Sequence, residues 1–460
     1  MWAASDIPRF YYENIGGIDF KLRELHEKHG HVVRYGPNHL SMTNSAAFKD
    51  LYGYGKNQLV KDPSVHGTIT KGQSGLSIIQ AGNADHVRIR RQLAHAFSER
   101  ALREQESIVQ GYVDTLITQL GEAADNGEKV DIMHKFMYTT SDITSELAFG
   151  TSFHSLRDDK LRPAVHLQDK FGVFITRARL LARFPVLAPL IALAIDKGTV
   201  QMMKQNRLWV RDVVDRRLAQ GTMEEKRDFL SYILKHKEED VAMTDDEIRE
   251  TSRTMIAAGA ETSRTVLSTL TYLLTTHPEV MERVQNEVRT SFPTEEAINF
   301  TDVSSKLQYM LACIDEAMRI HPPVPSHLMG RTTPSEGPHI VAGEAMPPGT
   351  TIVIHPLATM TSSKNFTDPL AFQPQRWTSD RDERFFKDDH TAFQPFSWGP
   401  RNCIGKNLAY SQMRLVLARV LWNFDIELCA ESKDWDQQKI LGFWQAGPLW
   451  VKLRRRGGKT

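Results

Sequence analysis

The sequence predicts a mainly α-helical protein with a minor β portion, built as a single large domain over residues 1–460. From about residue 85 to residue 234, charged residues are spaced around apolar stripes with a helical period. The chain shows no Gly/Ser run, Pro-rich tract, charge block or internal repeat that would mark a linker between domains. A length of 460 residues would suggest about three domains, but it also suits one large domain with an ample core.

Short extended runs come before these helices. Residues 32–35 and 39–43 flank a Gly-Pro-Asn turn, which is a hairpin signal. The longest predicted helix begins at Thr244, which forms a capping box with Glu247, and it ends before Pro278. Its roughly thirty residues would span about 45 Å, enough to cross a whole domain.

The C-terminal part mixes helices with short strands. A helix over residues 308–320 ends at a His-Pro-Pro sequence. Residues 340–355 predict short strands, interrupted by Pro347-Pro348-Gly349. A final helix covers about residues 407–423.

Composition excludes two classes of protein. The net charge of +1 and the lack of a basic stripe interleaved with aromatics argue against binding to nucleic acid. Cys313, Cys403 and Cys429 are far apart and form no zinc-type pair. So few cysteines indicate a reducing environment without a disulfide framework.

One cysteine stands in a glycine-rich loop, Phe396-Ser-Trp-Gly399-Pro-Arg401-Asn-Cys403-Ile-Gly405. A single thiolate ligand suits a haem iron, because the porphyrin supplies the other four equatorial ligands. The glycines let the backbone approach a flat macrocycle, and Arg401 can offer paired hydrogen bonds to a haem propionate. The alternative is a buried structural cysteine in a Gly-rich turn.

This loop resembles the cysteine-ligand loop of the cytochrome P-450 monooxygenases, and all five named positions match. The resemblance implies a cytochrome P-450 fold and a haem b whose iron is ligated by Cys403. It also implies that Phe396, Gly399, Arg401 and Gly405 surround that cofactor.

A second motif lies in the middle of the long helix, at Ala258-Gly259-Ala-Glu261-Thr262-Ser. The glycine costs roughly 1 kcal/mol there, which suggests a local opening of the helix. Met255, Ala258, Gly259 and Thr262 share one face. The motif resembles the oxygen-binding groove of the family, which implies that Ala258 and Gly259 line the cofactor, Thr262 hydrogen-bonds bound dioxygen and Glu261 helps to relay protons. Alternatively, Thr262 only bonds back to a carbonyl of the preceding turn.

Three further basic residues, besides Arg401, are candidates for binding the haem propionates. His86 and Arg90 stand one helical turn apart on a shared face. In the family this spacing usually carries Trp and Arg, so His86 is a departure, although an imidazole can still donate a hydrogen bond. Arg331 is a further candidate by the same resemblance. The alternative makes His86 an ordinary surface residue.

Glu316 and Arg319 are close enough to pair on one predicted helix, a weak signal by itself. The sequence Phe372-Gln-Pro374-Gln-Arg376-Trp377 follows, and the family has both motifs. The resemblance implies a buried structural network of Glu316, Arg319 and Arg376 behind the haem, in which losing one partner costs about 3 to 5 kcal/mol.

Together the motifs imply insertion of one oxygen atom from O2 into a C–H bond or alkene of a lipophilic small molecule, such as a terpenoid or polyketide secondary metabolite. Gly53-Tyr-Gly55 lacks the third glycine of a dinucleotide loop, so electrons from NADPH would arrive through a separate NADPH–cytochrome P-450 reductase, with cytochrome b5 as a second donor. Arg88, Arg91 and Lys406 either dock that donor or form a solvated face. Two rival interpretations are a haem-thiolate isomerase or dehydratase that needs no reductase, and a non-enzymatic haem or ligand binder.

The substrate pocket is expected, by analogy, from mostly apolar segments. These are residues 75–82, 171–195, 324–329 and 443–444, together with Met255 and Ala258.

Membrane attachment follows from the resemblance, which places the protein at the cytosolic face of the endoplasmic reticulum. No stretch reaches the ~18 to 20 apolar residues of a membrane span. The chain opens at Met1-Trp-Ala-Ala without an anchor or Pro-rich hinge, so this form could be soluble. Residues 184–195 could lie in a bilayer interface or pack on the body of the protein.

Overall fold

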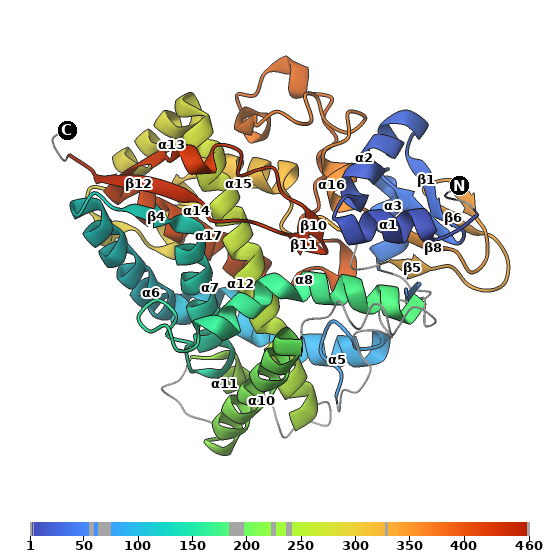
Figure 1. The fold of residues 1–460 in the computed structure, drawn as a ribbon, viewed down its shortest axis with the longest axis horizontal. Coiled ribbons are helices and arrows are strands. Elements are labelled where there is room, and N and C mark those ends of the chain that lie inside the picture. Colours follow the sequence, from blue (N-terminus) through green and yellow to red (C-terminus); the bar gives the residue numbers. More distant parts are fainter. Residues whose placement is uncertain are drawn as a thin grey trace.

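A computed structural model describes residues 2, 4–54, 59–62, 75–183, 197–221, 227–235, 242–326 and 330–457. Helices dominate it and the strands form small sheets, so the predicted mainly helical, single-domain fold is confirmed (Figure 1). The longer helices are α1 (Ile7–Ile15), α2 (Ile18–His29), α5 (Asn83–Ala94), α6 (Glu99–Asp125), α7 (Ile132–Phe149), α8 (Arg162–Arg183), α10 (Lys197–Ala219), α12 (Asp245–Thr276), α13 (Pro278–Ser291), α15 (Gln308–Ile320) and α17 (Lys406–Asn423). The shorter ones are α3 (Ala46–Tyr52), α11 (Phe229–Leu234), α14 (Phe300–Lys306) and α16 (Pro356–Met360), with 3-10 turns that include η4 (Pro374–Trp377) and η7 (Gly399–Arg401).

Helix α12 runs through the middle of the molecule (Figure 1). Its start is fixed by the predicted capping box, in which the Thr244 hydroxyl accepts from the Glu247 N–H and the Glu247 carboxylate accepts from the Thr244 N–H. Pro278 opens α13 as its first residue, since its missing N–H is not needed there. Helix α15 covers the predicted residues, and α17 begins one residue earlier than predicted.

The largest sheet brings distant segments together in the order β1-β2-β8-β5-β3. The predicted hairpin is confirmed as the antiparallel pair β1-β2, and β2 also pairs with β8 in parallel. The strands of this sheet are β1 (Val32–Gly36), β2 (His39–Met42), β3 (Val60–Lys61), β5 (Arg331–Thr332) and β8 (Thr351–Ile354). The short pairing of β3 with β5 sets Lys61 opposite Arg331, which matters for the site below.

The remaining sheets are small. One has the order β4-β12-β9, and β4 within it was not predicted because its partner β12 lies at the other end of the chain. The others are the hairpins β6-β7 and β10-β11. Their strands are β4 (Lys129–Asp131), β6 (His339–Val341), β7 (Glu344–Met346), β9 (Phe424–Leu428), β10 (Ile440–Leu441), β11 (Phe443–Trp444) and β12 (Trp450–Arg455).

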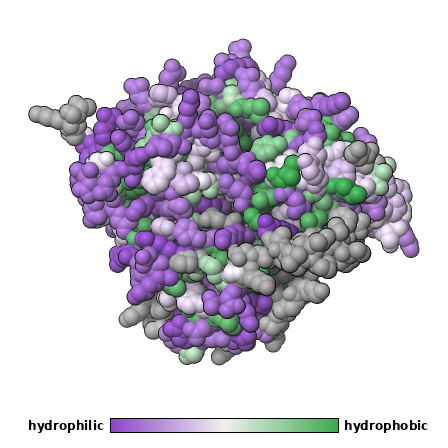
Figure 2. Space-filling view, viewed as in Figure 1, coloured by the Kyte–Doolittle hydropathy of each residue, from purple (hydrophilic) through white to green (hydrophobic). Residues whose placement is uncertain are grey.

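The main hydrophobic core lies among the helices. It is built from the apolar faces of α5, α6, α7, α12, α13, α15 and α17. On the face drawn in Figure 2, hydrophilic side chains cover most of the surface and hydrophobic ones form small groups. Over the described ranges, no helix combines the length and apolarity needed to cross a bilayer. Residues 184–195, considered above for interfacial binding, lie outside the described residues.

Candidate active site

The cysteine loop is closed by its own backbone. The N–H of Cys403 donates to the carbonyl oxygen of Phe396 at 2.9 Å. Gly399 has φ of +74°, and a Cβ there would stand 1.9 Å from the carbonyl oxygen of Tyr52. Only glycine therefore fits where the loop crosses the end of α3. Gly405 caps α17, and a Cβ on it would lie 3.9 Å from the Cys403 sulfur.

The thiol of Cys403 is accessible, whereas Cys313 and Cys429 are buried. The protein atoms crowded around it raise the pKa of Cys403, while the Gly405 N–H, Arg90 and Lys406 oppose that rise. The balance disfavours a free thiolate. A bound metal cation reverses it, since a coordinating thiol loses its proton. An accessible thiol in such surroundings suits a metal ligand.

One face of α12 is open in the middle of an otherwise buried helix. Ala258 is exposed, and Met255, Gly259 and Thr262 are half-exposed, so the four predicted residues do share an accessible face. The Thr262 hydroxyl donates to the Ala258 carbonyl at 2.7 Å, which is the back-bonding named above as the alternative.

The expected opening of α12 does not appear as a break, because the helix is continuous from residue 245 to residue 276. The Ala260 carbonyl receives a second donor, the hydroxyl of Thr140 on α7, at 3.0 Å. A Cβ on Gly259 would lie 2.9 Å from the methyl group of Thr144. Close packing of α12 on α7 therefore explains this glycine.

Glu261 lies in different surroundings from its neighbour Thr262. Its side chain is buried and pairs with Arg264, itself buried on the same helix. Arg264 also donates to the sulfur of Met133 at 3.0 Å. Arg264 was not predicted from the sequence. The signal was present, since Glu261 and Arg264 have the same Glu-x-x-Arg spacing as Glu316 and Arg319 on α15.

Five basic side chains gather near the cysteine loop, and we call them the basic cluster. They come from four separate elements, namely β3, β5, α5 and η7. The members are Lys61, His86, Arg90, Arg331 and Arg401. His86 and Arg331 are buried, and Arg331 lines one pocket with Arg401. Four of the five were predicted; Lys61 was not, because only the pairing of β3 with β5 brings it here.

Neutral oxygens satisfy three of these cations. Arg90 donates to the carbonyl and side-chain oxygens of Asn402, both at 2.6 Å. Arg401 donates to the carbonyl of Ala81 at 3.0 Å, and Lys61 donates to the same carbonyl at 3.1 Å. Among the described residues, no carboxylate pairs with Lys61, Arg90 or Arg401.

The pKa values of the cluster fall because its side chains are held away from water and, for three of them, because other cations lie close by. Burial, and then the neighbouring cations, lower the pKa of His86 to about 3. The same two causes lower the pKa of Lys61 to about 7 and that of Arg401 to about 10. Such a group of partly dehydrated basic side chains, with His86 as a neutral donor, is suited to a ligand that carries carboxylates, as haem does in its propionates.

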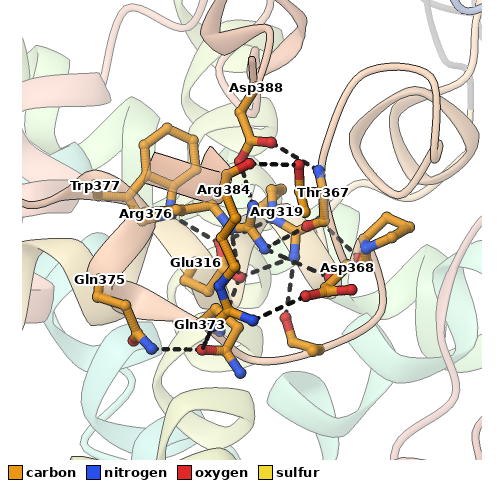
Figure 3. Close-up of polar contacts among 12 residues, drawn as sticks. Glu316, Arg319, Thr367, Asp368, Gln373, Gln375, Arg376, Trp377, Arg384 and Asp388 are labelled. Carbon is orange, nitrogen blue, oxygen red and sulfur yellow. Dashed lines mark hydrogen bonds and ion pairs between the residues drawn. The ribbon is translucent and has the colours of Figure 1, made fainter. Parts of the chain in front are cut away.

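Glu316 is the centre of a second polar group, which we call the Glu316 network (Figure 3). Both of its oxygens accept from Arg319 at 2.8 Å, and Arg376 and Trp377 add donors at 3.0 and 2.9 Å. Arg376 also pairs with Asp388. Glu316, Arg319 and Arg376 have no exposed surface. The structure thus brings these three together and adds Asp388, for which the sequence carried no signal.

Two of the three suggested docking cations remain accessible. Arg88 is instead held by Glu247, Asp85 and the Ala242 carbonyl, so its charge is already compensated. Arg91 and Lys406 are exposed.

Comparison with known proteins shows the family of the chain. The family model described as Cytochrome P-450 matches residues 10–448. The trichothecene C-4 hydroxylase of Trichoderma arundinaceum is 36% identical over 99% of this chain and 91% of its own length. The cytochrome P-450 monooxygenase astA of Talaromyces wortmannii is 38% identical over 100% of this chain and 91% of its own length. The corresponding olcB protein of Penicillium canescens is 34% identical over 99% of this chain and 92% of its own length.

These similarities define a haem-thiolate oxidoreductase of the monooxygenase class. The chain belongs to the cytochrome P-450 family, as the cysteine loop predicted. Members of this class use O2, a small-molecule substrate and a redox partner, and relatives of this chain belong to fungal secondary metabolism.

Proposed function

We propose that this protein binds haem b with Cys403 as a ligand of its iron and hydroxylates or epoxidises a lipophilic small molecule. The accessible Cys403 thiol beside the basic cluster carries this proposal, because it combines a metal ligand with a place for two carboxylates. The bound haem would supply the activation of O2 and the transfer of one oxygen atom. The protein would bind and orient the substrate and would deliver protons.

The basic cluster would hold the propionates. Arg90 and Arg401 now donate to neutral oxygens, and Arg331 and His86 approach from the sheet and from α5. Charged acceptors would form stronger hydrogen bonds with the same donors. Phe396, Gly399 and Gly405 would shape the loop around the cofactor, and Ala258 and Gly259 would border it on α12.

Thr262 and Glu261 would act on protons in two different ways. Because the Thr262 hydroxyl donates to the Ala258 carbonyl, its oxygen has lone pairs left to accept a hydrogen bond on the open face of α12. The Glu261 carboxylate is held by Arg264, so its part in the relay requires this buried pair to open. Glu316, Arg319 and Arg376 would have a structural role.

We infer that the substrate is a terpenoid or polyketide. Electrons would come from NADPH–cytochrome P-450 reductase, with cytochrome b5 as a second donor. The protein would act at the cytosolic face of the endoplasmic reticulum. A relative named as a trichothecene hydroxylase supports hydroxylation. Exposed Arg91 and Lys406 would face the electron donor. Of the expected pocket segments, parts of 171–195 and 324–329 lie outside the described residues.

The spectrum of the reduced protein with carbon monoxide tests the ligand. We expect a strongly red-shifted Soret band that is lost in Cys403→Ser and kept in Cys429→Ser, since Cys429 is a buried cysteine away from the loop. A red-shifted band in Cys403→Ser would refute the assignment. Turnover of a peroxide without NADPH or reductase would instead favour the isomerase or dehydratase.

Replacing Thr262 by Ala tests the proton role. NADPH should still be consumed, but product per NADPH should fall about 100-fold, the lower end of a proton-transfer effect, as hydrogen peroxide is released instead. Thr254→Ala is the matched control, because Thr254 makes the same back-bond two turns earlier on α12. Unchanged product per NADPH in Thr262→Ala would remove Thr262 from the relay.

A further inference from the structure

Three side chains, Phe396, Tyr410 and Asp315, contact one another at the start of the cysteine loop, and two of them, Tyr410 and Asp315, have no part in the function proposed above. The rings of Phe396 and Tyr410 are 5.2 Å apart between centroids and tilted by 46°. The Tyr410 hydroxyl donates to a carboxylate oxygen of Asp315 at 2.7 Å. Since the Cys403 N–H is bonded to the Phe396 carbonyl, contacts run without a gap from Asp315 on α15, through Tyr410 on α17, to the cysteine loop.

Charged groups surround these three side chains. Lys406 lies 5.8 Å from the centroid of the Phe396 ring, and Arg414 lies 5.4 Å from that of Tyr410. Glu316, the neighbour of Asp315 in sequence, adds a negative charge on α15. The carboxylate of Asp315 is thus held between cations on α17 and an anion on its own helix.

Asp315 titrates in the physiological range. Burial raises its pKa to about 6, against the Tyr410 hydrogen bond and the charges of Arg414 and Lys406. Burial, and then Asp315, raise the pKa of Tyr410, so the phenol stays protonated and remains a donor. Asp315 is therefore ionised at pH 7.5 and mostly protonated at pH 5.

We propose that Tyr410 and Asp315 are positioning residues that hold the Phe396 ring in place at the start of the cysteine loop, and that the charge on Asp315 sets how readily the bound haem accepts an electron. This inference depends on haem ligation by Cys403. Reduction adds one electron, from the flavoprotein donor or a chemical reductant, without making or breaking a bond of the protein. A fixed negative charge nearby opposes that addition, and its loss by protonation favours it.

The reduction potential of the haem protein, measured from pH 5 to pH 8.5 with redox mediators, tests the inference. In the unchanged protein the potential should rise as the pH falls through about 6. Asp315→Asn should have a more positive potential at pH 7.5 and should lose the step near pH 6. Tyr410→Phe keeps the ring but removes the donor that lowers the pKa of Asp315, so its step should move to higher pH.

Asp302→Asn provides the control, because it removes an acid from neighbouring α14 that pairs with Lys306 and not with Tyr410. Potentials of Asp315→Asn and Tyr410→Phe that follow the unchanged protein at every pH would overturn the inference. The carbon monoxide spectrum separates this failure from that of the proposed function. A retained red-shifted band with unmoved potentials refutes only the role of Asp315, whereas absence of the band in the unchanged protein refutes ligation by Cys403.

Discussion

The Glu316 network and the basic cluster are both groups of charged side chains, but they differ in their partners: among the described residues, carboxylates pair with the arginines of the network and not with Lys61, Arg90 or Arg401. The network sets two arginines against two carboxylates, and further donors come from Trp377 and the backbone of Gln373. In the basic cluster, three of the cations donate to carbonyl or asparagine oxygens and the pKa values are lowered. The network therefore belongs to the architecture of the fold, and the cluster is suited to an anionic ligand.

Breaking the network should have the largest effect. Arg376→Met leaves the buried Asp388 without its partner and Glu316 with Arg319 alone, so we expect a loss of about 3 to 5 kcal/mol in the free energy of unfolding, measured in urea. Arg384→Met is the matched control from the same region (Figure 3), since its pair with Asp368 is 44% and 53% exposed and should contribute less than about 1 kcal/mol. Equal losses in the two variants would mean that burial does not distinguish the two pairs.

Removing a cation from the basic cluster should weaken haem binding without destabilising the haem-free protein. Arg401→Met should leave the haem-free protein as stable as before, or more stable, because it relieves repulsion with Arg331. Haem release to a large excess of apomyoglobin should be about 10- to 100-fold faster, the value of one charged hydrogen bond. Haem dimethyl ester, which lacks free propionates, should abolish the difference, and Arg91→Met, on the exposed side of α5, should not change release. A loss of stability in haem-free Arg401→Met would show that the cluster is structural after all.

The smallest expected effect concerns pH. The pKa of His86 is about 3 in the folded protein and about 6.5 in an unfolded chain, so the unfolded state binds the extra proton between these values. Stability of the haem-free protein should therefore fall as the pH drops from 6.5 towards 3. His86→Gln should reduce the loss between pH 7 and pH 5 by about 1 to 2 kcal/mol, measured by urea unfolding at both values. His95→Gln, exposed at the end of the same segment, is the control. The same pH dependence in His86→Gln would assign it to other groups.

Local signals in the sequence were enough for much of the fold. The capping box at Thr244, Pro278 at the start of α13 and the helix over residues 308–320 were all predicted, because capping and proline geometry depend on residues within one turn. Strand β4 was missed, since a three-residue strand has no pattern of its own and is defined by its partner β12.

The sequence by itself determined the family, the cysteine loop and the types of residue around it, because these depend on spacing along the chain. Only the tertiary structure decided which charges are compensated. It joined Lys61 to the basic cluster through strand pairing, held Glu261 with Arg264, paired Arg88 with Glu247 and connected Asp315 to Tyr410. Each of these contacts depends on the direction of a side chain or on a partner far away in sequence. Burial then makes every such partner decisive, since a charge removed from water is stabilised only by the groups that the fold places beside it.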